Sequence, residues 1–250
     1  MKVRLDQLLC SLNLAPSLES ARALIGAGQV YVNDQIADKS GFLYSPNVDV
    51  RLKERCPYVS RGGLKLEKGL SHFQLYPDNW TCIDIGASTG GFTDCLLQHN
   101  VGKIYALDVA YGQLSWKIRQ NPKVVVFERF NGRKLTINDI FPDQIDLAVM
   151  DVSFISITTL LPPLLPLFKE KIRILALIKP QFELAKEEVG IGGVVNDPAL
   201  HEKAIKKIEL FVAHLGLISQ GTIASPVLGP KGNREFLIFC TSPHQESSPQ

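Results

Sequence analysis

The sequence predicts an α/β protein whose mostly parallel sheet ends in an antiparallel hairpin, preceded by a smaller α+β module. From Asp78 onward, apolar strands alternate with amphipathic helices, which is typical of a parallel sheet covered on both faces. Before residue 60, the spacing of the apolar residues indicates two short helices and a few short strands. A chain of 250 residues is long enough for one small and one medium domain.

The small module occupies the first sixty residues. Its leucines recur at helical spacing, and apolar residues then alternate as they do in strands. The expected elements are a helix at residues 5–12, a helix capped by Ser17 and ending at Gly28, a strand at 30–32, a turn at Asn33-Asp34 and a strand at 48–52.

The excess positive charge of the chain lies in this module. Residues 1–68 hold ten Lys and Arg against seven Asp and Glu, whereas residues 69–250 hold seventeen against eighteen. Arg4 and Arg22 lie in or beside the helices, and Arg51, Lys53 and Arg55 form a cationic strand end suited to phosphate groups. Charge alone leaves two interpretations open, phosphate contacts or ordinary solvated side chains.

The pattern of the module is more specific than its charge. The runs at residues 4–9 and 17–33, the second of which ends in Gly28-x-Val-x-Val-Asn33, resemble the S4 RNA-binding domain. The resemblance covers roughly residues 2–60 and implies a fold that sits on structured RNA through its two-helix face. The residues expected to contact RNA are Arg4, Arg22 and Arg61.

The second part of the chain contains seven expected strands separated by helices. The strands are at residues 81–85, 103–108, 124–127, 145–150, 173–178, 217–223 and 236–240, and the clearest helices are at 92–98, 113–120 and 198–215. The last two strands are joined by a loop at 226–233, which suits a terminal hairpin. Ligands of such sheets bind at the carboxyl ends of the parallel strands.

The first of these strands leads into a glycine-rich turn that opens a helix. Its spacing is neither that of a dinucleotide loop nor that of a P-loop, so the ligand is not expected to carry a pyrophosphate. Asp108 ends the next strand, 22 positions after Gly86, where an acidic side chain can accept bonds from ribose hydroxyls. Asp84 can hold the loop or meet an ammonium group. A ribose and a positive charge together suggest S-adenosylmethionine, and the alternative is a purely structural turn.

This region also resembles a known family. The run at residues 84–96, with Tyr105-Ala-Leu-Asp108-Val and Tyr111-Gly-Gln-Leu114, is similar to the TlyA family, and the similarity extends over essentially the whole chain. These are S4-containing members of the FtsJ-like ribosomal RNA 2′-O-methyltransferases, some of which carry a hemolysin label. The resemblance implies a Rossmann-like methyltransferase fold with a seven-stranded sheet, S-adenosyl-L-methionine as cofactor, and cytidine in ribosomal RNA or ribosomal subunits as target. The expected cofactor contacts are Asp84, Gly86, Ser88, Thr89, Gly90, Gly91, Phe92, Asp108 and Asn131.

Methyl transfer to a ribose hydroxyl needs an oriented acceptor oxygen, a group that takes the proton and a supporting charge network. Four charged residues stand at strand ends and loops that could meet, and they match the Lys-Asp-Lys-Glu tetrad of the family one for one. They are Lys65, Asp151, Lys179 and Glu235. We expect Lys179 to accept or steer the proton, Asp151 to orient that lysine, and the other two to place the ribose. Each residue alone could equally be a surface ion pair.

The expected organisation is an S4-like domain at 1–60, a connection at 61–77 that carries Lys65, a methyltransferase domain at 78–243 and a polar tail at 244–250. Five scattered cysteines without a C-x-x-C pair indicate neither disulfides nor a metal site. Without an apolar leader or spanning segment, the chain reads as a cytoplasmic protein with no membrane partner, and a monomer is favoured. Two alternatives remain: a membrane-lytic hemolysin, which liposome leakage would reveal, and a non-catalytic ribosome factor, which would need a broken tetrad or cofactor loop.

Overall fold

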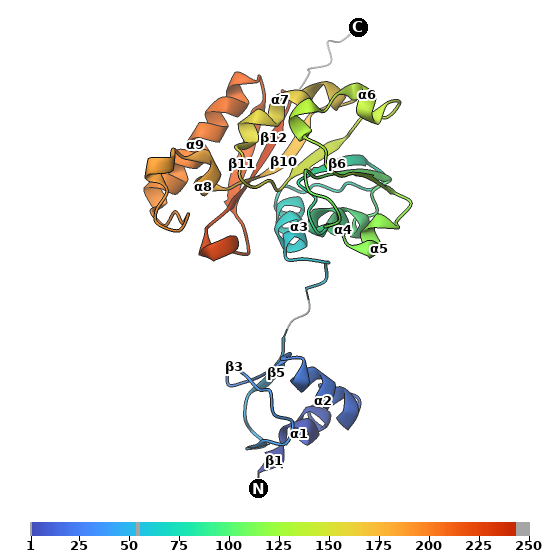
Figure 1. Ribbon diagram of the computed structural model, residues 1–250, viewed down its shortest axis with the longest axis vertical. Coiled ribbons are helices and arrows are strands. Elements are labelled where there is room, and N and C mark those ends of the chain that lie inside the picture. The colour runs from blue at the N-terminus through green and yellow to red at the C-terminus, as the bar shows by residue number, and fades with distance from the viewer. Residues whose placement is uncertain (1, 54–55, 244–250) are drawn as a thin grey trace. The chain divides into compact units, whose positions relative to one another are not determined.

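The computed structural model of the protein describes residues 2–53 and 56–243 (Figure 1). The expected polar tail at 244–250 and the cation Arg55 lie outside the described residues. The chain divides into two compact units, Met1–Arg55 and Cys56–Gln250. Each unit folds around its own apolar core, as the change of pattern along the sequence predicts.

The first unit contains the two helices and the small sheet that the sequence predicts. Its elements are β1 (Val3–Arg4), α1 (Leu5–Ser11), α2 (Leu18–Gly26), β2 (Val30–Val32), β3 (Gln35–Ile36), β4 (Leu43–Tyr44) and β5 (Val50–Leu52). The strands form a three-stranded sheet in the order β3-β2-β5 and a separate β1-β4 pair. The Ser17 hydroxyl accepts a bond from the Ser20 amide at 3.1 Å and caps α2 as expected.

A buried carboxylate joins the two helices of this unit. Asp6 is fully buried on α1 and accepts bonds from Arg4 at 2.8 Å and from Arg22 on α2 at 3.0 Å. The two guanidinium groups hold the pKa of Asp6 well below its usual range, against the opposing effect of burial. The arginines that the sequence singles out for RNA contact therefore also stabilise the fold, with their side chains still about half exposed.

The second unit is built on a seven-stranded sheet in the order β11-β12-β10-β9-β6-β7-β8. The strands are β6 (Thr81–Ile85), β7 (Lys103–Leu107), β8 (Val124–Phe127), β9 (Leu147–Met150), β10 (Arg173–Ile178), β11 (Ile218–Ala224) and β12 (Phe236–Thr241). The first five run parallel, and β12 pairs antiparallel with both β10 and β11. The expected mostly parallel sheet with a terminal hairpin is confirmed. Its parallel strands are buried on both faces, and such strands appear in a sequence as continuous apolar runs.

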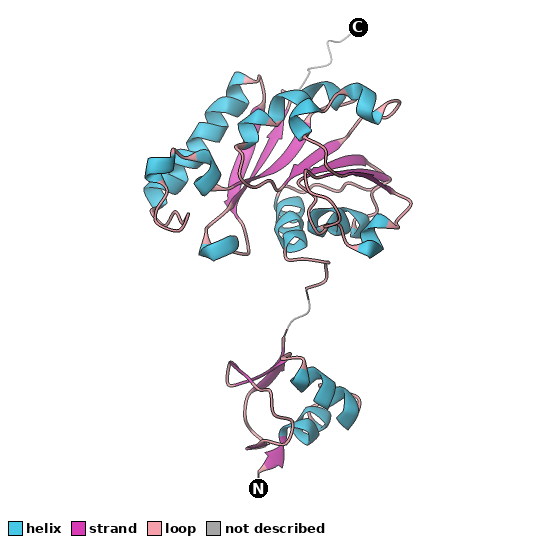
Figure 2. Ribbon diagram, in the orientation of Figure 1, coloured by secondary structure: helices cyan, strands magenta, loops and turns pink. Residues whose placement is uncertain are grey.

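Helices cover both faces of this sheet (Figure 2). They are α3 (Gly62–His72), α4 (Gly91–Gln98), α5 (Trp116–Arg119), α6 (Ile137–Ile140), α7 (Leu161–Leu164), α8 (Pro180–Glu183) and α9 (Pro198–His214), with short 3-10 turns at 132–134, 157–159, 165–167, 186–188 and 230–232. Figure 1 shows α3, α4 and α5 on one face and α6, α7 and α9 on the other. Two separate apolar clusters result, one for each face.

Two of the expected elements differ clearly in the structure. The segment expected as a connection between domains is mostly helix α3, which packs against α4 and β12 within the second unit. Its residues Leu66 and Leu70 are fully buried because their spacing of four residues puts them on one face of the helix. The helix expected at 113–120 is reduced to α5, since the Ser115 amide bonds the Thr89 carbonyl at 3.1 Å instead of continuing a helix backward.

Candidate active site

Two adjoining hollows lie at the carboxyl ends of the parallel strands of the second unit. The first, about 300 Å³, lies between the start of α3, the glycine-rich loop and the loop at 227–230. The second, about 380 Å³, lies between the ends of β6, β7 and β9. Four residues line both hollows: Gly86, Ser88, Asp151 and Ser153. Two ligands, one in each hollow, would therefore meet at this junction.

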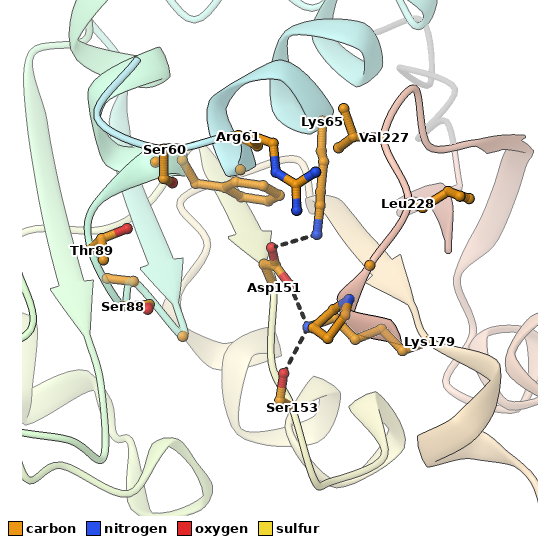
Figure 3. A pocket seen from close by; sticks show the side chains of 17 residues that line it. Ser60, Arg61, Lys65, Ser88, Thr89, Asp151, Ser153, Lys179, Val227 and Leu228 are labelled. Atoms are coloured by element: carbon orange, nitrogen blue, oxygen red, sulfur yellow. Dashed lines mark hydrogen bonds and ion pairs between the residues drawn. The ribbon is translucent and has the colours of Figure 1, made fainter. Parts of the chain in front are cut away.

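The four charged residues singled out in the sequence converge at this junction. Figure 3 shows three of them, Lys65, Asp151 and Lys179. The ammonium of Lys65 lies 2.6 Å from Glu235 Oε2 and 3.3 Å from Asp151 Oδ2. The ammonium of Lys179 lies 2.6 Å from Asp151 Oδ1. Both lysines and Glu235 are buried, so two cations and two carboxylates form one nearly desolvated chain. Such a cluster is costly unless its charges balance, and here they do.

The topology explains why residues so distant in sequence meet. Asp151 directly follows β9 and Lys179 directly follows β10, and these two parallel strands are neighbours. Glu235 directly precedes β12, which runs antiparallel to β10 and so begins at the same edge of the sheet. Lys65 reaches this edge from α3. The sequence prediction assigned Lys65 to a connection, whereas the structure places it on a packed helix.

Sequence reasoning missed one polar residue of this group. The ammonium of Lys179 donates a hydrogen bond to Ser153 Oγ at 2.8 Å (Figure 3). Together with Asp151, this hydroxyl fixes the direction of the lysine head group by two partners on one loop. The sequence offered one sign of this contact. Ser153 lies two positions after Asp151 at the end of an apolar strand, so both residues lie near the same edge of the sheet.

The glycine-rich loop between β6 and α4 brings backbone close to the junction. Gly86 has a φ of +84°, and a Cβ atom there would lie 2.7 Å from the Asp151 carbonyl oxygen. A Cβ atom on Gly91 would lie 2.2 Å from Ser60 Oγ. Thr89 and Phe92 line the first hollow with Gly91. Only glycines permit this close approach, and the cradle they leave is open to a ligand.

Two of the expected cofactor contacts lie beneath the loop instead of in the hollows. Gly90, with a φ of +96°, precedes α4 and packs against Leu114 and Ile118. Asp84 is fully buried and accepts a bond from Thr93 Oγ1 at 2.6 Å, while its Oδ1 atom has no partner among the described residues. Burial raises the pKa of Asp84 to about 7. The structure thus supports the loop-holding role of Asp84 through Thr93.

The second hollow has the polar and apolar groups of a nucleoside site. Asp108 lines it and accepts bonds from the Ser88 amide at 2.7 Å and the Ala110 amide at 2.8 Å, which fix its carboxylate while leaving lone pairs for ribose hydroxyls. Asn131 and Phe130 line the same hollow. A glycine cradle, a strand-end carboxylate and an apolar wall are what S-adenosylmethionine requires, so the residues present fit this cofactor.

The residues expected to contact RNA divide between the two units. Arg61 lines the first hollow, beside Lys65 in Figure 3. Arg4 and Arg22 belong to the first unit, where both bind Asp6. RNA contact by these three arginines stays a prediction. Among the described residues, no helix has the length and the apolar content needed to cross a membrane.

Comparisons with known proteins match both units. Residues 58–241 match the family described as FtsJ-like methyltransferase, and residues 3–50 match the S4 domain. YqxC of Bacillus subtilis is 45% identical over 95% of this chain and 85% of its own length. The Mycobacterium tuberculosis protein named 16S/23S rRNA (cytidine-2′-O)-methyltransferase TlyA is 41% identical over 95% of this chain and 89% of its own.

Solved structures agree with these matches. A hemolysin-named protein of Streptococcus thermophilus has a TM-score of 0.75 at 39% identity, covering 100% of this chain and 90% of its own. The resemblances stated from the sequence are therefore confirmed for both parts of the chain. The chain belongs to the FtsJ-like methyltransferase family and carries an S4 domain before the methyltransferase fold.

Proposed function

We propose that the protein transfers the methyl group of S-adenosylmethionine to a ribose 2′-hydroxyl of ribosomal RNA. The observation that carries this proposal is the buried Lys65–Asp151–Lys179–Glu235 chain at the junction of two hollows. The second hollow would hold the nucleoside of the cofactor, and the first would receive the acceptor ribose. Intact tetrad and loop residues argue against a non-catalytic ribosome factor.

The chemistry assigned to these residues is proton transfer and positioning. When bound, S-adenosylmethionine would supply the methyl group that replaces the proton on the 2′-oxygen, and the Nζ atom of Lys179 would accept that proton. Only the neutral amine has a lone pair for this proton, so the ammonium described above must first release a proton to solvent. Asp151 and Ser153 aim its head group, and Lys65 with Glu235 supports the ribose and the moving charge.

The target is proposed from the relatives and from the first unit. The relative of Campylobacter jejuni is named as a 23S rRNA (cytidine-2′-O)-methyltransferase, and that of M. tuberculosis as a 16S/23S enzyme. We infer cytidine as the methylated nucleotide, ribosomal subunits as partners, and the cytoplasm as the location. The S4 unit would grip the RNA backbone through Arg4 and Arg22, with Arg61 near the acceptor.

Transfer of labelled methyl groups to purified small and large ribosomal subunits tests this proposal. We expect labelled 2′-O-methylcytidine in one or both subunits, mapped by nuclease digestion. Lys179→Ala should lower the rate at least about a hundredfold, because a positioned base contributes a factor of that order. Lys169→Ala is the matched control, since Lys169 is exposed and lies at the opposite end of β10.

Cofactor affinity separates chemistry from binding in this experiment. Calorimetry should find S-adenosylmethionine binding to Lys179→Ala within a few-fold of the parent. Methyl transfer by Lys179→Ala at a rate near that of Lys169→Ala would refute the assignment of Lys179. Transfer to neither subunit by the parent protein would refute ribosomal RNA as the substrate.

A further inference from the structure

Away from the tetrad, three side chains of the types that bind metals converge where α3 and α4 pack together. They are Glu67 on α3, Cys95 on α4 and His99 directly after α4. Their ligand atoms all lie within 4.8 Å of one another. Figure 1 shows the two helices side by side on one face of the sheet. The cluster takes no part in the chemistry proposed above.

Two separations within the cluster fit a tetrahedral cation, and the third, between the ligand atoms of Cys95 and His99, is at most 4.8 Å. Glu67 Oε2 lies 3.3 Å from His99 Nε2 and 3.7 Å from Cys95 Sγ. Zinc bonds of about 2.0 Å to oxygen and nitrogen and about 2.3 Å to sulfur put neighbouring ligand atoms about 3.3 to 3.5 Å apart. Small side-chain adjustments would therefore bring all three atoms to bonding distance of one ion.

The local structure supports such a site in two ways. Cys95 and His99 are four residues apart at the end of α4, a spacing that puts two ligands on the same side of a helix. The Tyr58 hydroxyl donates a hydrogen bond to Glu67 Oε2 at 2.7 Å. Carboxylates that bind metals are commonly held by an outer partner of this kind, which fixes their orientation.

The exposure of the three side chains allows an ion to enter. Cys95 is fully buried, whereas the side chains of His99 and Glu67 are 27% and 42% exposed. The sulfur thus forms the floor of the cluster, and the carboxylate and imidazole form its open side. Water can supply a fourth ligand from that side, as in three-ligand zinc sites.

We propose that Glu67, Cys95 and His99 form a binding site for a thiophilic divalent cation of the zinc class. On binding, the S–H bond of Cys95 breaks, sulfur bonds to the metal and the proton goes to solvent. The ion would link α3, which carries Lys65, to α4, which begins at the glycine-rich loop. Cysteine spacing alone predicts no metal site here because the other ligands come from position i+4 and from another helix.

Cobalt(II) is a suitable spectroscopic probe for the full-length protein after removal of metals with a chelator. We expect a near-ultraviolet thiolate-to-cobalt charge-transfer band that saturates at one ion per chain and disappears when zinc is added. Zinc should also raise the melting temperature of the second unit, followed by tryptophan fluorescence, because it binds only the folded cluster. Neither readout depends on methyl transfer.

Matched variants decide whether the band belongs to this cluster. Cys95→Ser and His99→Ala should abolish the band and the zinc-dependent shift in melting temperature. Cys56→Ser and His72→Ala should keep both, since Cys56 and His72 are exposed residues outside the cluster. Circular dichroism and cofactor binding verify that each variant is folded. Absence of the band in the parent protein, or its retention in Cys95→Ser, would overturn the proposal and leave a hydrogen-bonded cluster.

Discussion

The buried carboxyl group of Asp84 should destabilise the folded second unit at neutral and alkaline pH. Burial raises its pKa from 3.8 to about 7, so the folded state binds this proton more tightly than the unfolded state. The penalty is absent below pH 3.8, grows as the pH rises toward 7 and is complete above it. At about 1.4 kcal/mol per pH unit, the full penalty is about 4 kcal/mol.

Asp84→Asn removes the charge and keeps an oxygen that can accept the Thr93 hydroxyl bond. We expect the variant to be more stable than the parent by about 1 to 3 kcal/mol at pH 8. The gain falls short of the full penalty because the amide NH2 group that replaces Oδ1 carries two N–H donors without a partner. Near pH 5 the difference should shrink to about half or less.

Urea unfolding followed by tryptophan fluorescence is the appropriate assay. Both tryptophans, Trp80 and Trp116, belong to the second unit, so the signal reports the unit that contains Asp84. Asp78→Asn provides the control, because Asp78 is exposed and its change should stay within about 0.5 kcal/mol. A variant that is no more stable than the parent at pH 8, or a gain that is the same at pH 5 and pH 8, would refute the reasoning.

Contacts within each unit support three further predictions. Ser153→Ala should lower kcat about tenfold with unchanged cofactor affinity, because the Lys179 ammonium loses a hydrogen-bond acceptor at 2.8 Å. Ser153→Thr should restore kcat, and a parental kcat in the alanine variant would contradict this role of Ser153. Gly229→Ala should reduce methyl transfer at least about tenfold in a folded protein, since its Cβ would lie 2.1 Å from Glu235 Oε1. Full activity would contradict this prediction and show that the loop at 227–230 moves to make room for the methyl group. Asp6→Asn should destabilise the first unit by about 1 to 3 kcal/mol, measured by hydrogen exchange of α1 and α2 amides, because two arginines lose their charged partner. The parent protein should lose this stabilisation as the pH falls below about 4, since the folded-state pKa of Asp6 is lowered. Hydrogen exchange in Asp6→Asn that equals that of the parent would contradict the role of Asp6.

The sheet and the ends of its strands could be predicted from the sequence with good accuracy. The strands expected at 81–85, 124–127 and 173–178 have those bounds in the structure, since continuous apolar runs between polar residues define them. The tetrad was accessible for the same reason. Asp151 and Lys179 are polar residues at the ends of apolar parallel strands, and such ends meet at one edge.

The parts that escaped prediction depend on tertiary contacts. Helix α3 has little apolar content, and only its packing against α4 and β12 makes it part of the second unit. Whether Asp84 faces a ligand or lies beneath the loop depends on side-chain directions that its position at the end of β6 leaves open. The bond between Lys179 and Ser153 likewise results from the course of the loop after β9.

The pairing of Lys65 with Glu235 has a consequence for biosynthesis. One partner lies on the first helix of the second unit and the other directly precedes the last strand, which inserts between β10 and β11. A nascent chain can assemble the S4 unit and the first parallel strands while it is still being translated. The charge chain, however, lacks its last member until β12 has left the ribosome. Methyl transfer should therefore begin only after Glu235 has emerged and β12 has joined the sheet, and fragments ending before Glu235 should be inactive even if they bind RNA.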